Sequence, residues 1–202
     1  MSKFTRGVVL ASASEARATM LREAGVAVDI APAHVDEEAI REAFRAEGVT
    51  PRDLADALAE AKARRVSANH PDALVIGADQ VLVTEGATFD KPRDRAEARE
   101  QLMHLRGGAH ELLSAAVVVV GGAPVWRHIG AARLTMRPFS DAFLDAYLEA
   151  EGDAVLSTVG GYRIEGRGAQ LFSRVSGDYF SILGMPLLEV LGYLRTRKVL
   201  VE

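Results

Sequence analysis

Short continuous apolar runs alternate along the chain with segments whose apolar residues recur at helical spacing. Glycine, proline and small polar residues separate them, a pattern typical of buried strands between amphipathic helices. We predict strands at 8–10, 26–31, 73–84, 111–120, 125–136 and 169–175. We predict helices at 15–24, 39–47, 51–69, 95–105, 141–150 and 186–197.

Capping signals mark several helix ends. Ser14 precedes the first predicted helix and Gly25 follows it, while Gly48 ends the second. Thr50 and Pro51 offer an N-cap followed by proline at the first helical position. The passage from the first strand to the first helix therefore falls at residues 11–14.

Strands interleaved with helices predict the α/β class. The strands at 111–120 and 125–136 predict a hairpin around Gly121-Gly122, and a sheet that combines such a hairpin with strand–helix units is mixed. No internal repeat or linker interrupts the sequence, so we predict one domain over residues 1–202.

Composition narrows the classes of protein. The 202 residues are 49% hydrophobic and 26% charged, with a formal net charge of -4, so there is no basic footprint for nucleic acid or an anionic membrane. The chain has no cysteine, which excludes disulfides and thiolate metal sites. Its apolar runs are shorter than the roughly 20 residues that span a bilayer. We expect a cytoplasmic protein without nucleic-acid or membrane partners.

The first candidate site is the turn Ser12-Ala13-Ser14-Glu15-Ala16-Arg17. A helix N-terminus presents unpaired amides and a partial positive charge, so it can hold phosphate oxygens, and Arg17 adds a charged group. A simple capped surface helix is the alternative reading.

The second candidate is Asp79, at the end of the most apolar strand and followed by Gln80. A carboxylate there can orient a metal ion or take a proton from an attacking water. A strand-end aspartate that makes local backbone hydrogen bonds is the alternative.

Further charges could serve phosphate chemistry. Asp36-Glu37-Glu38 could hold a hard cation, and Lys62 and Lys91 could neutralise a leaving pyrophosphate. Each of them alone also fits a solvated surface charge. The glycine-rich segment 160–168, which contains Glu165, permits either close ligand approach or ordinary turns.

Seven short motifs, read together and in order, resemble the Maf family over nearly the whole chain. They are Leu10-Ala11-Ser12-Ala13-Ser14, Val35-Asp36-Glu37, Gly77-Ala78-Asp79-Gln80, Lys91-Pro92, Leu105-Arg106-Gly107 with His110, Gly160-Gly161-Tyr162, and Gly177-Asp178 with Gly184-Met185-Pro186. Each motif alone is unspecific, but their common order and spacing make the resemblance specific.

The resemblance implies a fold like that of inosine triphosphate pyrophosphatases: an elongated mixed sheet with flanking helices, a cleft between two lobes, and commonly a homodimer. It implies hydrolysis of a nucleoside triphosphate to the monophosphate and pyrophosphate, with Mg²⁺ or Mn²⁺. Asp79 matches the proton acceptor and, with Glu37, the metal shell. The residues that match the phosphate shell are Ser12, Ser14, Arg17, Lys62 and Lys91.

Base selection is where the sequence departs from the family pattern. The family usually shows proline and then arginine or an aromatic residue after the second serine, whereas this chain has Glu15 and Ala16 before Arg17. Gln80 and Glu165 resemble the branch that hydrolyses 7-methyl-GTP, since the dTTP and UTP branch tends to carry threonine and glutamine there.

Physical chemistry favours guanine in the same way. A carboxylate such as Glu165 can accept both the N1–H and N2–H of guanine. Glu165 could instead pair with Arg163 or Arg167 at the surface. Two further alternatives stay open: a dTTP/UTP pyrophosphatase, and a nucleotide-binding regulator of cell division without turnover.

Overall fold

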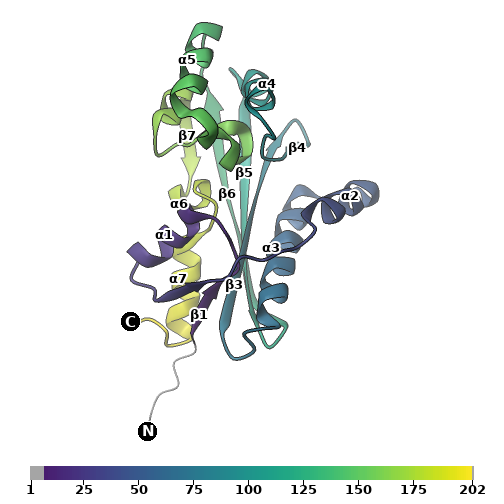
Figure 1. Ribbon diagram of the computed structural model, residues 1–202. Coiled ribbons are helices and arrows are strands. Elements are labelled where there is room, and N and C mark those ends of the chain that lie inside the picture. The colour runs from purple at the N-terminus through teal and green to yellow at the C-terminus, as the bar shows by residue number, and fades with distance from the viewer. Residues whose placement is uncertain (1–6, 202) are drawn as a thin grey trace. The chain divides into compact units, whose positions relative to one another are not determined.

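Strands and helices alternate from the first described residues onward. The computed structural model describes residues 7–201, and within them seven strands form one mixed sheet (Figure 1). The strands are β1 (Val8–Leu10), β2 (Val28–Ile30), β3 (Leu74–Thr84), β4 (Ala87–Phe89), β5 (Ala109–Val120), β6 (Ala123–Met136) and β7 (Phe172–Gly177). The α-helices are α1 (Glu15–Glu23), α2 (Glu37–Glu47), α3 (Pro51–Ser67), α4 (Arg95–Leu105), α5 (Asp141–Glu151), α6 (Tyr179–Ile182) and α7 (Leu187–Thr196).

The sheet confirms the predicted α/β class. Its order is β2-β1-β3-β5-β6-β7, with β4 paired to β3. Strand β1 runs parallel to both β2 and β3, whereas β4 is antiparallel to β3 and β7 to β6. The mixture follows from connectivity, because strand–helix–strand crossovers give parallel pairs and short turns give antiparallel ones.

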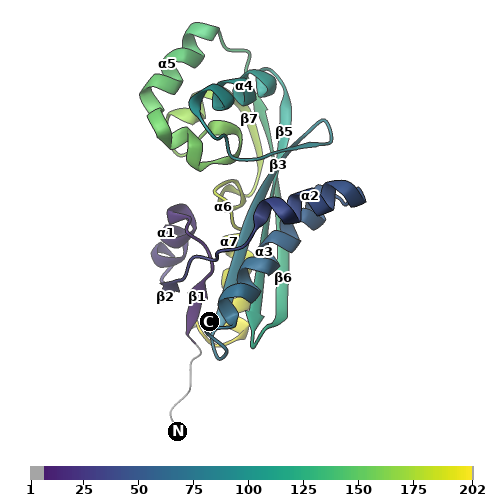
Figure 2. The same ribbon diagram turned by 45° about the vertical axis from the view of Figure 1, so that its right-hand side comes forward.

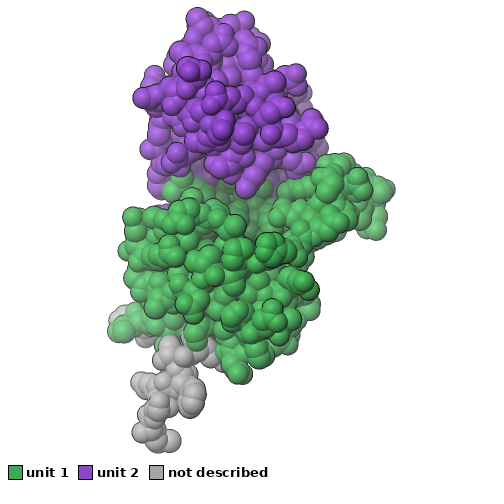
Figure 3. All heavy atoms as spheres, viewed as in Figure 1, with its two compact units in different colours: residues 1–80, 114–130, 183–202 green, residues 81–113, 131–182 purple. Residues whose placement is uncertain are grey.

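The chain forms two compact units, each assembled from separate segments (Figure 3). Unit 1 comprises residues 7–80, 114–130 and 183–201, and unit 2 comprises residues 81–113 and 131–182. Strands β3, β5 and β6 contribute residues to both units.

Unit 1 buries β1 and the first part of β3 between helices. Val8, Val9 and Leu10 are all at most 3% exposed. Helices α1 and α7 lie on one face of these strands and α3 lies on the other (Figures 1 and 2). The α1 N-cap is Ser14, as predicted, and its side chain accepts a hydrogen bond from the amide of Arg17. The turn from β1 into α1 is thereby fixed beside β3.

Unit 2 has its own apolar core. It includes Leu82, Leu102, Leu134, Leu144 and Leu171, each fully buried. Helices α4 and α5 and three short 3₁₀ helices, η1 (Gly152–Ser157), η2 (Val159–Gly161) and η3 (Arg167–Leu171), surround this core.

Some elements differ from the sequence-based expectations. The strand predicted at 169–175 begins only at Phe172, because η3 occupies the preceding residues. A Cβ on Gly168 would lie 2.4 Å from the carbonyl oxygen of Arg163, so the chain there is folded tightly on itself and cannot extend. Strand β4 and helix α6 were not predicted, since three or four residues are too few to establish a hydrophobic period.

Candidate active site

The buried stripe of α3 carries a lysine. Leu58, Ala59, Lys62, Ala63 and Val66 are all buried, at the spacing of one helix face. The stripe packs on β3, and its single charged member is 8% exposed. A lysine in such a place needs anionic partners, since an unpaired buried charge is costly.

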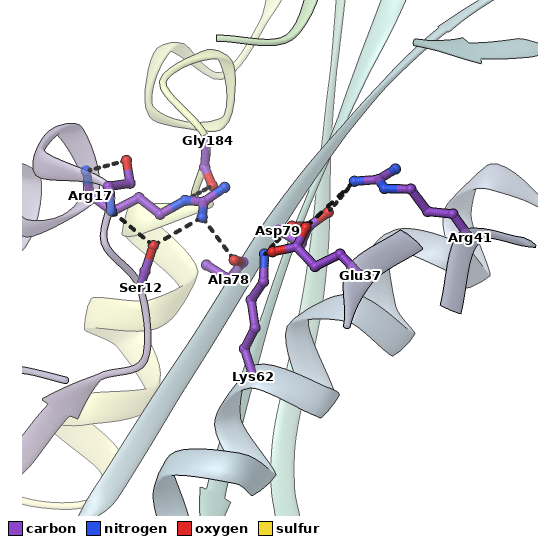
Figure 4. A network of polar contacts seen from close by, with 9 residues as sticks. Ser12, Arg17, Glu37, Arg41, Lys62, Ala78, Asp79 and Gly184 are labelled. Carbon is purple, nitrogen blue, oxygen red and sulfur yellow. Dashed lines mark hydrogen bonds and ion pairs between the residues drawn. The ribbon is translucent and has the colours of Figure 1, made fainter. Parts of the chain in front are cut away.

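Asp79 on β3 and Glu37 at the start of α2 supply those partners (Figure 4). The Lys62 Nζ lies 2.6 Å from Asp79 Oδ1 and 2.9 Å from Glu37 Oε1. Asp79 is 4% exposed, so its carboxylate is nearly removed from water. The carboxylates predicted from separate motifs thus share one ammonium group.

Gly77 explains how α3 comes close enough to deliver Lys62. A Cβ at this position would lie 2.0 Å from the carbonyl oxygen of Ala59 and 2.9 Å from the Cβ of Ala63. Only glycine allows the helix backbone to lie directly on the strand at this point. Asp79 follows two residues later, so its side chain projects from the same face as the Gly77 hydrogen.

Arg41 completes a cluster of four charged residues, and it is the member that could not be recognised as a candidate from the sequence motifs. It is 9% exposed, and its Nη2 lies 3.8 Å from Glu37 Oε2 and 3.9 Å from Asp79 Oδ2. Its separation of four residues from Glu37 on a helix was the available signal, because such residues face each other. The cluster therefore holds two carboxylates and two cations.

A second cluster surrounds the turn between β1 and α1. Ser12 is 7% exposed, and its Oγ accepts hydrogen bonds from the Ser14 amide and from Arg17 Nη1, both at 3.2 Å. Arg17 Nη1 also donates to the Ala78 carbonyl at 2.8 Å, and its Nε donates to the Gly184 carbonyl at 2.8 Å. The turn, β3 and the segment before α7 are therefore joined through one guanidinium group.

The two clusters meet where Ala78 and Asp79 are consecutive (Figure 4). These residues lie in the middle of β3, so the expectation that Asp79 ends a strand was wrong: β3 continues to Thr84, where it pairs with β4. Burial lowers the pKa of Arg17 below its ordinary value, and the negative charges of Asp79 and Glu37 oppose that shift. Because the charges of both carboxylates act on Arg17, the turn between β1 and α1 and the carboxylate cluster belong to one electrostatic environment.

The carboxylates also suit a hard divalent cation. Asp79 Oδ2 is buried and has no hydrogen-bond donor among the described residues, and Glu37 is half-exposed beside it. The described residues contain no group of three or more potential metal ligands. Glu37 and Asp79 alone could hold Mg²⁺ only together with waters and substrate phosphates, which is how this cation is usually bound.

The remaining predicted residues lie as follows. Ala16 is exposed on the first turn of α1, and Gln80 Nε2 donates to Ser114 Oγ at 3.0 Å. Lys91 and Glu165 belong to unit 2 and are exposed. Glu165 accepts a hydrogen bond of 3.1 Å from Arg163, the surface pairing considered as an alternative above.

Comparison with known proteins supports a specific family. Residues 7–197 match the family model described as Maf-like protein. The nucleoside triphosphate pyrophosphatase of Paramagnetospirillum magneticum is 53% identical over 193 residues, which cover 96% of this chain and 100% of the relative. That of Granulibacter bethesdensis is 51% identical over 193 residues, covering 96% and 98%.

Nucleoside triphosphate pyrophosphatase 1 of a Jannaschia species is 51% identical over 190 residues, which cover 94% of this chain and 96% of the relative. In the part of the chain that the structure describes, no helix has both the length and the apolar character to cross a membrane.

The family model and the relatives match almost the full length of the chain, and the ordered motifs, the mixed sheet and the charge clusters at β3 agree with them. Together they show that this chain belongs to the Maf family.

Proposed function

We propose that the chain hydrolyses a nucleoside triphosphate to the monophosphate and pyrophosphate, as the names of its relatives state for them. The observation that carries the proposal is the buried Asp79, bonded to Lys62 at 2.6 Å and next to the turn of Ser12 and Arg17. A buried base beside an anion-binding turn suits attack of water on a phosphoanhydride bond.

Asp79 is the proposed proton acceptor. A water oxygen forms a bond to the α-phosphorus while the bond from that phosphorus to the oxygen bridging to the β-phosphorus breaks. The water proton passes to the Asp79 carboxylate, and the electron pair of the broken bond leaves with pyrophosphate. Lys62 donates to Oδ1, and Oδ2, which accepts no hydrogen bond among the described residues and lies 3.9 Å from Arg41 Nη2, is the oxygen proposed to take the proton.

The phosphates are proposed to bind the N-terminus of α1. The first amides of a helix have no intrahelical partner and carry a partial positive charge. Ser12, Ser14 and Arg17 supply further donors, and Lys62 and Lys91 are proposed to balance the charge of the leaving group. Glu37 and Asp79 would hold Mg²⁺ or Mn²⁺, which when bound supplies Lewis-acid stabilisation of phosphate charge.

We expect Asp79→Asn to lower the rate of pyrophosphate release by about 10²–10⁴-fold, the usual contribution of a general base. Asparagine keeps the shape and can still accept from Lys62, so the fold should be retained. The measurement is pyrophosphate and monophosphate release from a panel of triphosphates with Mg²⁺. Asp153→Asn, which removes an exposed carboxylate paired to Arg95, is the matched control. Near wild-type turnover by Asp79→Asn would remove Asp79 from this role.

The same panel separates the enzyme from a nucleotide-binding regulator of cell division. Binding of triphosphates by the wild-type protein without any product would favour the regulator. Pyrophosphate release that Asp79→Asn abolishes would favour the enzyme.

For the base we propose a guanine preference, with 7-methyl-GTP as the favoured substrate and dTTP or UTP as the alternative. The proposal rests on Gln80 and Glu165 and on the two donors of the guanine edge. We expect Glu165→Gln to erode the ratio of kcat/KM for 7-methyl-GTP over that for UTP. Arg163→Gln is the matched control, because it breaks the same ion pair but keeps the carboxylate. A wild-type preference for dTTP or UTP, unchanged by Glu165→Gln, would contradict the proposal.

A homodimer and a cytoplasmic location complete the proposal. The first rests on the family resemblance, and the second on a composition without cysteine.

A further inference from the structure

We propose that Arg17 is chiefly a positioning residue, which orients the Ser12 hydroxyl so that Ser12 is the side-chain donor to a substrate phosphate. This inference rests on the proposed function and narrows the role of Arg17 within it. It follows from how the hydrogen-bonding capacity of the two side chains is used.

The guanidinium of Arg17 is largely committed to the protein itself. Its Nη1 donates to Ser12 Oγ at 3.2 Å and to the Ala78 carbonyl at 2.8 Å, and its Nε donates to the Gly184 carbonyl at 2.8 Å. A guanidinium is a rigid planar fork, so three acceptors in three different segments fix its position and its plane. These bonds direct three of its five N–H donors away from any ligand.

The close packing at Gly184 supports this view. A Cβ on Gly184 would lie 3.2 Å from Arg17 Nε and 3.3 Å from Nη2, at a backbone φ of +107°. The segment before α7 is thus shaped around the guanidinium. An arginine that bound phosphate through a mobile side chain would not require a neighbouring residue packed this closely against its guanidinium.

The hydrogen bonds at Ser12 leave only its hydroxyl proton without a partner in the described part of the chain. A hydroxyl oxygen has two acceptor lone pairs and one proton to donate. The Ser14 amide and Arg17 Nη1 occupy both lone pairs, each at 3.2 Å. Among the described residues, none accepts a hydrogen bond from this hydroxyl, which is 7% exposed. The proton is therefore available to an acceptor outside the protein, and a phosphate oxygen is such an acceptor.

The test is a double-mutant cycle of Ser12→Ala, Arg17→Lys and the variant with both changes. Lysine keeps the positive charge but cannot bridge three acceptors in one plane. The readouts are kcat and KM for pyrophosphate release, and calorimetric affinity for a triphosphate with a non-hydrolysable α,β-methylene bridge. We expect each single change to lower kcat/KM on the order of tenfold or more. The double variant should be no worse than the poorer single variant within about threefold, because Arg17 acts through Ser12.

Ser14→Ala supplies the matched control. Ser14 belongs to the same turn, but its hydroxyl accepts from the Arg17 amide rather than from the guanidinium. Combined with Arg17→Lys, it should give losses that multiply. A purely structural role of Arg17 would lower the unfolding temperature without the specific coupling to Ser12.

Gly184→Ala keeps the inference testable if Arg17→Lys does not fold. It retains both Ser12 and Arg17 but displaces the guanidinium, and its loss should likewise disappear in the Ser12→Ala background. If the wild-type protein is active and the losses from Ser12→Ala and Arg17→Lys multiply in the double variant, this inference is overturned and the proposed function stands. A wild-type protein that releases no pyrophosphate from any triphosphate would overturn the proposed function and this inference together.

Discussion

His110 and Tyr162 form a buried polar pair within unit 2. His110 is 2% exposed, and its Nε2 lies 2.7 Å from the Tyr162 hydroxyl. Burial lowers the pKa of His110 to about 4, and its Nδ1 has no hydrogen-bond partner among the described residues. The imidazole is therefore neutral at physiological pH, and the pair fastens β5 to the segment that follows η2.

This pair should make stability depend on pH. The folded-state pKa of about 4 lies below the ordinary 6.5, so the unfolded chain binds the extra proton between those values. Stability is then retained above about pH 6.5 and lost as the pH falls toward 4, by about 2 kcal/mol between pH 7 and pH 5. Chemical denaturation at pH 7 and pH 5 measures the loss of unfolding free energy in the wild type and in the double variant that carries both His110→Phe and Tyr162→Phe. An equal loss in the variant would show that other groups cause it.

Several residues of the candidate site could be predicted from sequence because a charged or hydroxyl side chain stands at a position that the strand and helix pattern makes unusual. Ser12 lies in a strand-to-helix turn, and Asp79 is a carboxylate within an otherwise apolar strand. Lys62 was expected as a charge that could neutralise pyrophosphate, and only the structure shows it buried on the apolar face of α3. By contrast, the Ala78 and Gly184 acceptors are backbone carbonyls, which carry no residue-type signal, so only the folded chain shows how Arg17 is held.

At the scale of elements, the contact of α3 with β3 determines the geometry of the charged cluster. Gly77, Ala59 and Ala63 form a patch of small residues where the two backbones approach. Lys62 lies next to Ala63, so a displacement of the helix at this patch moves the ammonium relative to Asp79.

We expect Gly77→Ala to lower both stability and activity. The added Cβ would lie 2.0 Å from a backbone oxygen, so α3 has to shift, at a cost of about 1–3 kcal/mol or more. Gly192→Ala is the control, since a Cβ there meets nothing within 4 Å and its helical position favours alanine by roughly 0.5–1 kcal/mol. Thermal unfolding and pyrophosphate release are measured on both. Unchanged values for Gly77→Ala would contradict the close approach.

The elements themselves were predictable where they are long and clearly bounded. Helix α4 has the predicted limits, and α3 and β3 differ by one or two residues at an end. The segment from Gly160 to Gly168 was not assigned, because glycine permits both extended and left-handed backbone. Gly160 and Gly161 adopt φ of +78° and +70°, values that depend on the surrounding contacts.

For the whole molecule, the α/β class and mixed sheet followed from the alternation of patterns, but the two compact units did not. Their limits fall between Gln80 and Val81 in β3, Leu113 and Ser114 in β5, and Gly130 and Ala131 in β6. A boundary between units that falls inside a strand lacks the polar, proline-rich or flexible linker that usually marks a boundary in the sequence. Composition therefore carries no mark of the division.

Because unit 1 includes residues from 183 onward, the order of protein synthesis bears on the site. Gly184, which accepts from Arg17, follows it by 167 positions. At bacterial and eukaryotic elongation rates, this interval takes on the order of 10–30 s. Once residue 79 has been added, the nascent chain contains Ser12, Lys62 and Asp79, but the Arg17 guanidinium still lacks one of its three acceptors until Gly184 is made. A polypeptide released by the ribosome before Gly184 would carry all of the proposed acidic and basic groups and still lack the carbonyl that accepts from Arg17 Nε.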